Sequence, residues 1–299
     1  MEAGATPADP QVLTTMGFWR SGATSKPARM RFAELYANAV ERLGDRSAPA
    51  RVGALHTLEA LGSEFPQQRS AIINVLCAYL RMPGEDDGPV RVTATRILVV
   101  HLRPASPGFW PGVSVDLTGA SLTDLDLSGC QVDGDLTLDG AAVHGVAKLR
   151  RLIIGGVFSL RHAIVHDHMW LERSEFGGQV RADFATFHGD TWFGESTFSA
   201  GASFVGTTFG GHAWFAGCTV RGAVDFSRGL FRSSAGFRGA TMPSVSLADT
   251  TFLGPARVSR KGEAWNIYAP GWTVVTDPDN ESVGQLLWLG DPRLVSPPA

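Results

Sequence analysis

The sequence predicts a mainly β repeat protein with a helical region ahead of its repeats. The first observation is a register of apolar centres between Leu138 and Phe252, spaced alternately five and six residues apart. The second is a small side chain two residues before most centres. Because residues two apart in extended backbone share a face, this small side chain and its centre both point inward. The third is an abundance of Gly, Phe and Thr, which disfavours an 11-residue helical supercoil. Such a period is typical of repeat architectures with a narrow interior.

The composition restricts the function. The chain has 299 residues, of which 44% are hydrophobic and 18% charged, as in globular proteins. A formal net charge of −3 argues against direct nucleic-acid binding, which needs a basic face. Three widely spaced cysteines offer neither a disulfide framework nor a metal-binding pair, which fits a reducing, cytoplasmic setting. No apolar run is long enough for a membrane span, so none is expected.

The chain divides into four parts. Residues 1–27 show no sustained period and are predicted to be a disordered leader, in which Phe18 and Trp19 could act as anchors. Residues 28–104 show helical periodicity and are predicted to form four short helices that cap the open end of the repeats. The repeats themselves occupy residues 112–252. Residues 253–299 are predicted to form a C-terminal cap and tail.

Turn and cap residues set the expected helix ends. The second helix is expected to begin at Ser47 and Pro49 and to end at Gly62. Pro66 is expected to open the third helix, and Pro83 to stop it.

The apolar centres are predicted to point inward as a stacked core. The aromatic centres in the second half of the repeats are Phe193, Phe198, Phe204, Phe209, Phe215, Phe226 and Phe231. Cys130 and Cys218 take small inward positions and Cys77 has apolar helical neighbours, so we interpret all three as core residues rather than nucleophiles. The sequence has no P-loop, GxSxG, HExxH or dinucleotide-binding motif. An enzyme is therefore not expected, and no cofactor is predicted.

The repeats resemble a known family. Residues 202–209 (ASFVGTTF) and 213–220 (AWFAGCTV) are similar to pentapeptide-repeat proteins, in the variant whose units alternate five and six residues. This resemblance covers about residues 115–252 and implies a right-handed, quadrilateral β-helix with four units per coil. Residues 115–122 (VDLTGASL) are similar to the family's strict five-residue form. The helical region, including residues 52–59 (VGALHTLE), resembles a segment that precedes such repeats in actinobacterial members.

Four units per coil place residues 22 apart above one another. Trp170, Trp192 and Trp214 then form an outward column, which we expect to be covered. The favoured interpretation is that the C-terminal tail, which carries Trp265, Trp272 and Trp288, folds back over this column, and the alternative hypothesis is that the three tryptophans bind a partner.

Histidines form a second column beside the first. His144, His166 and His188 are also 22 residues apart, and His168 and His212 are expected in the same wide corner. Such an edge could hold zinc, since imidazole is a common zinc ligand. No carboxylate or thiolate lies at a fixed offset to complete a site, so solvated rings are the favoured interpretation and no metal is predicted.

The sequence favours a non-enzymatic scaffold that presents a rigid β-helix surface to a protein partner of unknown identity. The alternative, suggested by quinolone-resistance members of the family, is a DNA-mimicking modulator of a type II topoisomerase (gyrase). That mimicry requires a strongly acidic surface, whereas residues 115–252 hold ten Lys and Arg against fourteen Asp and Glu. Six aspartates lie between residues 116 and 139 and four arginines between 221 and 238, a polarity that could support a homodimer or end-to-end association.

Overall fold

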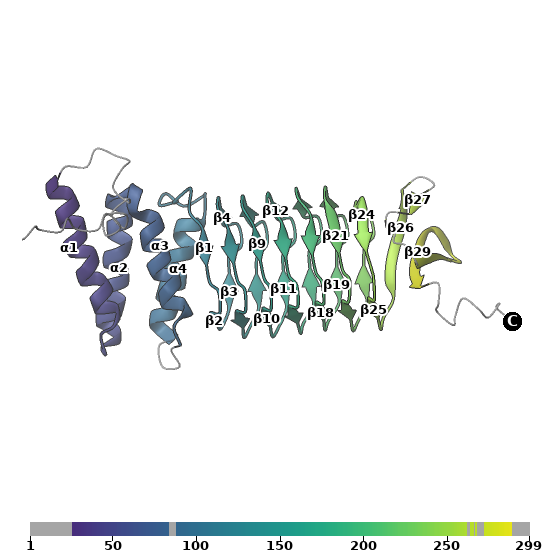
Figure 1. Cartoon of the computed structure of the whole chain (residues 1–299), viewed down its shortest axis with the longest axis horizontal. Helices are drawn as coiled ribbons and strands as arrows, with labels where there is room; N and C mark the ends of the chain where they lie inside the picture. Colours follow the sequence, from purple (N-terminus) through teal and green to yellow (C-terminus); the bar gives the residue numbers. More distant parts are fainter. Residues whose placement is uncertain (1–25, 84–87, 262–263, 266, 268–271, 289–299) are drawn as a thin grey trace, which may run out of the picture.

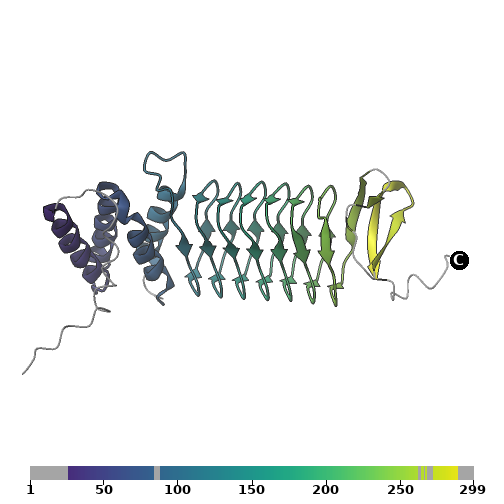
Figure 2. The same ribbon diagram turned by 45° about the horizontal axis from the view of Figure 1, so that its top comes forward.

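The computed structural model describes residues 26–83, 88–261, 264–265, 267 and 272–288. The described chain is elongated, with helices at one end, a four-sided β-solenoid in the middle and a β-hairpin at the other end (Figure 1, Figure 2). The predicted mainly β solenoid of about six turns behind N-terminal helices is confirmed, and its right-handed turn stays a prediction. Phe18 and Trp19 lie outside the described residues.

The helical end contains α1 (Lys26–Leu43), α2 (Ala48–Glu64), the short 3-10 helix η2 (Pro66–Gln68), α3 (Arg69–Arg81) and α4 (Gly88–Leu102). Ser47 lies at the N-cap of α2 with extended backbone and Pro49 is in the first turn, although the Ser47 side chain makes no capping hydrogen bond. The third helix stops at Arg81 because the residue before a proline disfavours helical backbone, and Met82 is extended (φ −68°, ψ 141°).

One expected helix end is wrong, and its cause is a packing contact. Gly62 does not end α2, which continues to Glu64. A Cβ at Gly62 would lie 2.3 Å from Cη2 of Trp110, so this glycine lets the indole ring pack directly against the helix. The Trp110 ring also stacks on His101 at a centroid distance of 3.8 Å, under the Arg69 guanidinium. Gly62 therefore serves the joint between the helices and the rod.

The two helix pairs are built alike. The pattern Pro-x-Arg-Val occurs near the start of α2 and again, 40 residues later, near the start of α4. Arg51 donates to the carbonyl of Asp45 (2.6 Å), just beyond α1. Arg91 donates to the carbonyl of Leu80 (2.6 Å), at the end of α3. Arg91 also donates to the carbonyl of Ser121 (2.7 Å), so the second pair holds the first coil as well as its own helix end.

The rod has four faces, each a parallel sheet in which every strand comes from a different coil. Face A contains β1 (Val115–Asp116), β5 (Leu136–Thr137), β9 (Phe158–Ser159), β13 (Val180–Arg181), β17 (Ala202–Ser203), β21 (Ala223–Asp225) and β24 (Ser244–Ser246). Face B contains β2 (Ser121–Leu122), β6 (Ala142–Val143), β10 (Ile164–Val165), β14 (Thr186–Phe187), β18 (Thr208–Phe209), β22 (Leu230–Phe231) and β25 (Thr251–Phe252).

The other two faces complete each coil. Face C contains β3 (Leu125–Asp126), β7 (Ala147–Lys148), β11 (Met169–Trp170), β15 (Thr191–Trp192), β19 (Ala213–Trp214) and β23 (Ala235–Gly236). Face D contains β4 (Gln131–Val132), β8 (Ile153–Ile154), β12 (Glu175–Phe176), β16 (Thr197–Phe198) and β20 (Thr219–Val220). Because the chain visits A, B, C and D in turn, faces A and C lie on opposite sides of the rod.

The corners alternate between tight and wide, which explains the alternation of five and six residues. Each tight corner contains one residue with positive φ, two positions after the apolar centre. Several of these are not glycine, among them Arg151 (φ 54°), Phe184 (φ 58°) and Glu195 (φ 59°). Left-handed backbone is uncommon for such residues. The strand ladders on both sides hold these corners in register.

The interior is a set of aromatic stacks. All seven phenylalanines expected in the core are exposed by 1% or less. Phe204 stacks on Phe226 one coil further on (5.1 Å between centroids), and Phe209 stacks on Phe231 (4.6 Å). Parallel-displaced stacks of this kind add to the stabilisation from burying apolar area.

Hydroxyl groups at several small inward positions are hydrogen-bonded, whereas the buried hydroxyl of Thr191 has no partner among the described residues. The Ser196 hydroxyl donates to the carbonyl of Leu171 (2.7 Å) and accepts from the backbone N–H of Ser174 (3.0 Å). Thr207 donates in the same way to Ala182 (2.7 Å). These bonds link successive coils inside the core, so Ser196 and Thr207 are accommodated there without the cost of an unpaired group.

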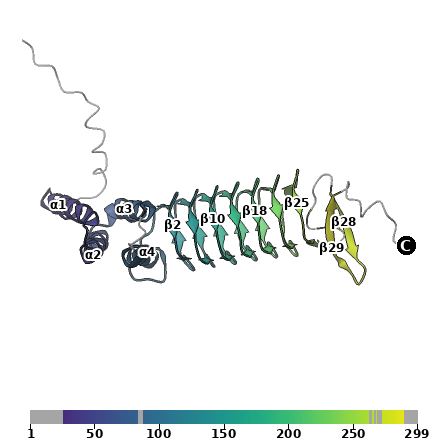
Figure 3. The same cartoon turned by 90° about the horizontal axis from the view of Figure 1, so that it is seen from below.

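The C-terminal segment extends face C beyond the repeats. Strand β26 (Ala256–Lys261) pairs with β23 in parallel and with β29 (Asn280–Trp288) in antiparallel, while β27 (Ala264–Trp265) and β28 (Trp272–Asp277) flank them. The ladder therefore passes the predicted last centre, Phe252. The Trp272 ring packs edge-on against Phe252 (5.4 Å) and covers the end of the core. Figure 3 shows this hairpin beyond the last coil.

The helices cover the other end of the rod and neutralise part of its acidic first coil. Arg81 of α3 forms an ion pair with Asp116, and Arg103, just after α4, lies 3.9 Å from Asp126. Two of the six clustered aspartates thus belong to the joint between the helices and the rod. The polarity seen in the sequence is therefore partly satisfied within the chain.

Candidate interaction face

Face C carries the tryptophans predicted from the repeat register. Trp192 is paired in register with Trp170 on one side and Trp214 on the other. In each of β11, β15 and β19 the residue before the tryptophan is buried and the tryptophan is half-buried, so all three rings lie on the outer surface of one face. From the first coil to β26, the outward column of face C is Asp126, Lys148, Trp170, Trp192, Trp214, Gly236 and Arg257, and the sheet continues through Gln285 of β29 and Val275 of β28.

The rings are held in place by their neighbours. The Arg150 guanidinium lies over Trp170, 4.4 Å from the ring centroid, as in a cation–π contact. Trp170 and Trp192 meet edge to face at 6.2 Å. The Trp214 ring lies over the next strand, since a Cβ at Gly236 would be 2.4 Å from Cε3 of Trp214. Gly236 therefore provides the space into which this ring leans.

The described part of the C-terminal segment does not cover the column. Its strands continue face C along the rod axis instead of folding back, and Trp272 packs at the end of the core. The side chains of Trp265 and Trp288 lie outside the described residues. The described strands of this segment thus continue the sheet beyond the last coil, and residues 289–299, on which part of the tail prediction falls, lie outside the described residues.

The histidines fall into two columns. His144, His166 and His188 form a ladder of nearly parallel rings at centroid distances of 5.0 and 5.4 Å. His168 and His212 belong to a different column of the same wide corner, next to the tryptophans. His168 lies 5.4 Å from the ring of Trp192 in the neighbouring coil, and His212 lies 5.8 Å from that of Trp214.

Hydrogen bonds occupy one ring nitrogen, Nδ1, of each histidine in the second column. The Nδ1 of His168 accepts from the backbone N–H of Asp190 (3.0 Å), and the backbone N–H of His212 donates to the Asp190 carboxylate (2.7 Å). The Nδ1 of His212 pairs with the hydroxyl of Ser234 (2.6 Å). Nowhere in the described chain do three His, Cys, Asp or Glu side chains gather as potential metal ligands. This arrangement supports a ladder of rings rather than a zinc site.

The three cysteines are buried thiols. Burial raises the pKa of Cys77 and of Cys130 to about 11 and that of Cys218 to about 12. The Cys218 thiol points inward and donates to the carbonyl of Phe193 (3.0 Å). Because the thiolate is the nucleophile, thiols with such raised pKa values are unreactive near neutral pH.

Ion pairs run along the tight corner between faces C and D. Arg150 contacts Glu172 at 2.9 Å, and Arg173 contacts Glu195 at 2.9 Å, each one coil further on. The hydrogen bonds to Glu172 hold the pKa of Arg150 above its usual value. The edge of the tryptophan face is therefore lined by paired charges of both signs.

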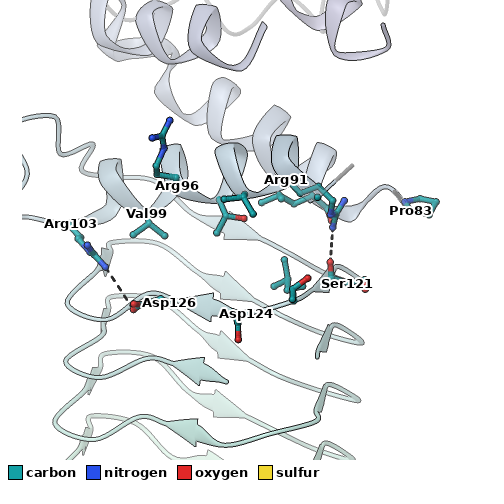
Figure 4. A pocket seen from close by; sticks show the side chains of 14 residues that line it. Pro83, Arg91, Arg96, Val99, Arg103, Ser121, Asp124 and Asp126 are labelled. Atoms are coloured by element: carbon teal, nitrogen blue, oxygen red, sulfur yellow. Dashed lines mark hydrogen bonds and ion pairs between the residues drawn. The ribbon is translucent and has the colours of Figure 1, made fainter. Parts of the chain in front are cut away.

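A cleft of about 760 Å³, which the sequence did not predict, lies between α4 and the first coil (Figure 4). Arg91, Arg96 and Arg103 line its helical side, and Asp124 and Asp126 line the side of the coil. Arg91 is bound to backbone carbonyls, and Arg103 is paired with Asp126. Since most of its charged groups join the helices to the rod, we interpret the cleft as part of that joint.

Sequence reasoning missed three features of this site: the Arg150 contact with Trp170, the role of Gly236, and the separation of the histidines. The first two could be found from the 22-residue columns, because Gly236 follows Trp214 by one coil. The exposed ring of Phe184 (48% exposed), at a positive-φ corner, was also missed. It stacks on His162 (5.3 Å).

None of the described helices is long and apolar enough to cross a membrane. Among known families, a model described as pentapeptide repeats (9 copies) matches residues 171–219 and 215–260. No curated protein and no solved structure matches the chain.

Proposed function

The repeats of this chain belong to the pentapeptide-repeat family, and from that premise we propose that the protein is a non-enzymatic scaffold that holds face C against a protein partner. The β-helix itself fits an interaction role, because stacked repeats create an extended surface. The proposed contact residues are Trp170, Trp192 and Trp214, with Arg150 beside them.

The observation that carries this proposal is the half-buried column of three tryptophans. Soluble monomers rarely leave a contiguous aromatic patch on their surface unless it binds something. Tryptophan and arginine are also the residues most enriched among those that dominate binding energy at interfaces. Arg150 over Trp170 combines both in one place.

The rigidity of the rod supports the same role. Each coil is hydrogen-bonded to the next on all four faces, as between Phe193 and Trp214 (2.7 Å) and between Leu171 and Trp192 (2.7 Å) on face C. A surface already fixed in its binding shape loses less conformational entropy on association. Face C thus offers a preformed platform rather than a flexible patch.

The residue chemistry of the described chain supports a role without catalysis. The three thiols are buried with raised pKa values, and the histidines nearest the tryptophans bind backbone and hydroxyl groups. Three free, buried cysteines also fit a reducing compartment, so a cytoplasmic location is part of the proposal.

The charge pattern favours a protein partner over DNA mimicry. The outward residues of face A include Asp116 and Asp225 but also Arg181, and face C includes Lys148 and Arg257. A DNA mimic needs rows of uncompensated carboxylates. We expect a gyrase supercoiling assay to be unaffected by the protein. Inhibition or protection of gyrase at stoichiometric protein would favour the topoisomerase alternative.

Site-specific photo-crosslinking tests the proposed face. A photoreactive amino acid replaces Trp192, and in a matched control it replaces Ser203 in face A, on the opposite side of the rod. In the cell that makes the protein, we expect position 192 to capture one protein species that position 203 does not. Equal capture from both positions, or capture from position 203 alone, would contradict the assignment of face C.

A further inference from the structure

Face C is complementary to itself when one copy is turned end over end. We propose that the partner of face C is a second copy of this chain, docked antiparallel across a two-fold axis that passes through Trp192. This inference rests on the proposed function, because it names the partner of the same face. A two-fold interface uses one patch twice, so each contact must suit its own counterpart.

The charges on face C determine the relative direction and the register of the two rods. Along the rod the outward column reads Asp126, Lys148, Trp170, Trp192, Trp214, Gly236 and Arg257. An axis at Trp192 places Asp126 of one copy opposite Arg257 of the other, three coils from the axis. Both side chains are exposed. Within its own chain, Oδ1 of Asp126 accepts from the backbone N–H of Ser128 (3.0 Å) and lies 3.9 Å from Arg103, so the other carboxylate oxygen, Oδ2, has room for a second cation.

Other arrangements are less favourable. Parallel rods would place Asp126, Lys148 and Arg257 each against itself, which gives three like-charge contacts. An antiparallel axis between Trp192 and Trp214 would place Lys148 opposite Arg257. Like charges facing each other across an interface cost several kcal/mol. The register centred on Trp192 is the one that joins opposite charges at both ends.

The remaining pair of the column is also complementary. An axis at Trp192 brings Lys148 of one copy opposite Gly236 of the other. The Trp214 ring covers this glycine, so the Lys148 ammonium would meet an indole face. A cation over the face of tryptophan is attracted by the ring quadrupole.

At three positions along the edges of face C, the side chains of the two copies are complementary in size. One coil before Trp192 the edge residues are His166, Glu172 and Arg173, and one coil after it the equivalent residues are Gly210, Ala216 and Gly217. An antiparallel pair therefore sets each of these three long side chains opposite a small one, while His168 meets His212 beside the tryptophans. Two basic contacts, Arg150 with Arg238 and His144 with Arg232, would lie two coils from the axis, at solvated edges where salt screens them.

The size of the face predicts a weak dimer. Six strand spacings make it about 29 Å long, and five to six residues make each side about 16 Å wide. Such a face buries roughly 900 Å² in total, at the low end of specific interfaces. Association should therefore be detectable at tens of micromolar rather than at nanomolar concentration.

The test is sedimentation equilibrium of the full chain from about 1 to 200 µM, in the wild type and in charge variants. We expect a monomer–dimer equilibrium. Arg257→Asp should raise the dissociation constant about tenfold or more, because it faces Asp126 of the second copy. The double variant Asp126→Arg with Arg257→Asp should restore dimerisation. Arg181→Asp, on the opposite face, is the matched control and should change nothing.

Crosslinking gives a second readout that does not depend on the charges. Trp192→Cys places a thiol at the two-fold axis and should form a disulfide-linked dimer on mild oxidation, whereas Ser203→Cys in face A should not. A chain that stays monomeric at 200 µM, or a double variant that is no better than Arg257→Asp, would overturn the inference. If position 192 nevertheless captures a different protein, the proposed function stands and only its identification with a second copy fails.

Discussion

The rod and the helical end bury their apolar residues in different ways. In the rod each inward position recurs in every coil, so Phe204 stacks on Phe226 much as Phe193 stacks on Phe215. At the helical end the key contact occurs once, where Trp110 packs against Gly62. A repeated core follows from the period alone. A unique joint depends on two residues that are far apart in the sequence.

The largest expected effect breaks a repeated stack. Phe204→Ala removes a ring exposed by 1% from the middle of the core, and it should reduce the free energy of unfolding by about 3–5 kcal/mol through lost burial and the cavity left behind. The control is Phe184→Ala, at an exposed corner of the same rod, where about 0.5 kcal/mol is expected. Chemical denaturation measures both. Equal losses would contradict the register described here.

The next effect concerns the unique joint. Gly62→Ala would force a methyl group into the Trp110 ring and should cost about 1–3 kcal/mol, as overpacking does. Gly53→Ala lies in the same helix with nothing within 4 Å of the added Cβ, so it should stabilise the protein by about 0.5–1 kcal/mol. Thermal unfolding of the two variants gives opposite signs if the Trp110 contact is real. Two stabilised variants would show that Trp110 does not pack on Gly62.

The smallest effect is pH-dependent and tests a surface ladder of the rod. Burial opposes the charge of Asp139, but hydrogen bonds from Arg161 and Ser159 outweigh it and hold the pKa of this carboxyl below its usual value. A carboxyl whose pKa is lowered in the folded state contributes stability above its unfolded pKa of about 3.9. That contribution is lost as the pH falls through the folded value.

Asp139→Asn should therefore be less stable than the wild type at pH 7, and the difference should shrink below about pH 4. Urea denaturation across this range measures it. A difference that stays constant down to pH 2 would show that the ionised carboxylate is not the cause.

Sequence reasoning could predict the parts of the fold that repeat. The spacing of apolar centres placed the core phenylalanines and put Trp170, Trp192 and Trp214 on one face, because period and backbone geometry determine both. The continuation of face C through Arg257 was not predicted, although it follows the repeat: Val258 is buried six residues after Phe252, with the small Ala256 two residues before it.

What sequence reasoning could not predict depends on contacts between distant residues. Gly62 looked like a helix end because the Trp110 ring that requires it lies 48 positions away in the sequence. Sequence reasoning placed all five histidines on one edge, because His166 and His168 are only two positions apart. In the structure His168 and His212 form a separate column, in which both are hydrogen-bonded to Asp190. The similar roles of Arg51 and Arg91 were readable from a 40-residue internal repeat that was missed.

The most direct test of face C compares binding and stability in one variant, Trp192→Ser. The account predicts that self-association weakens by about tenfold or more, while the free energy of unfolding changes by about 1 kcal/mol or less, because the ring lies on the outer surface of face C. A loss of several kcal/mol in stability, or association that persists unchanged, would contradict the claim that the tryptophan column exists to bind a partner.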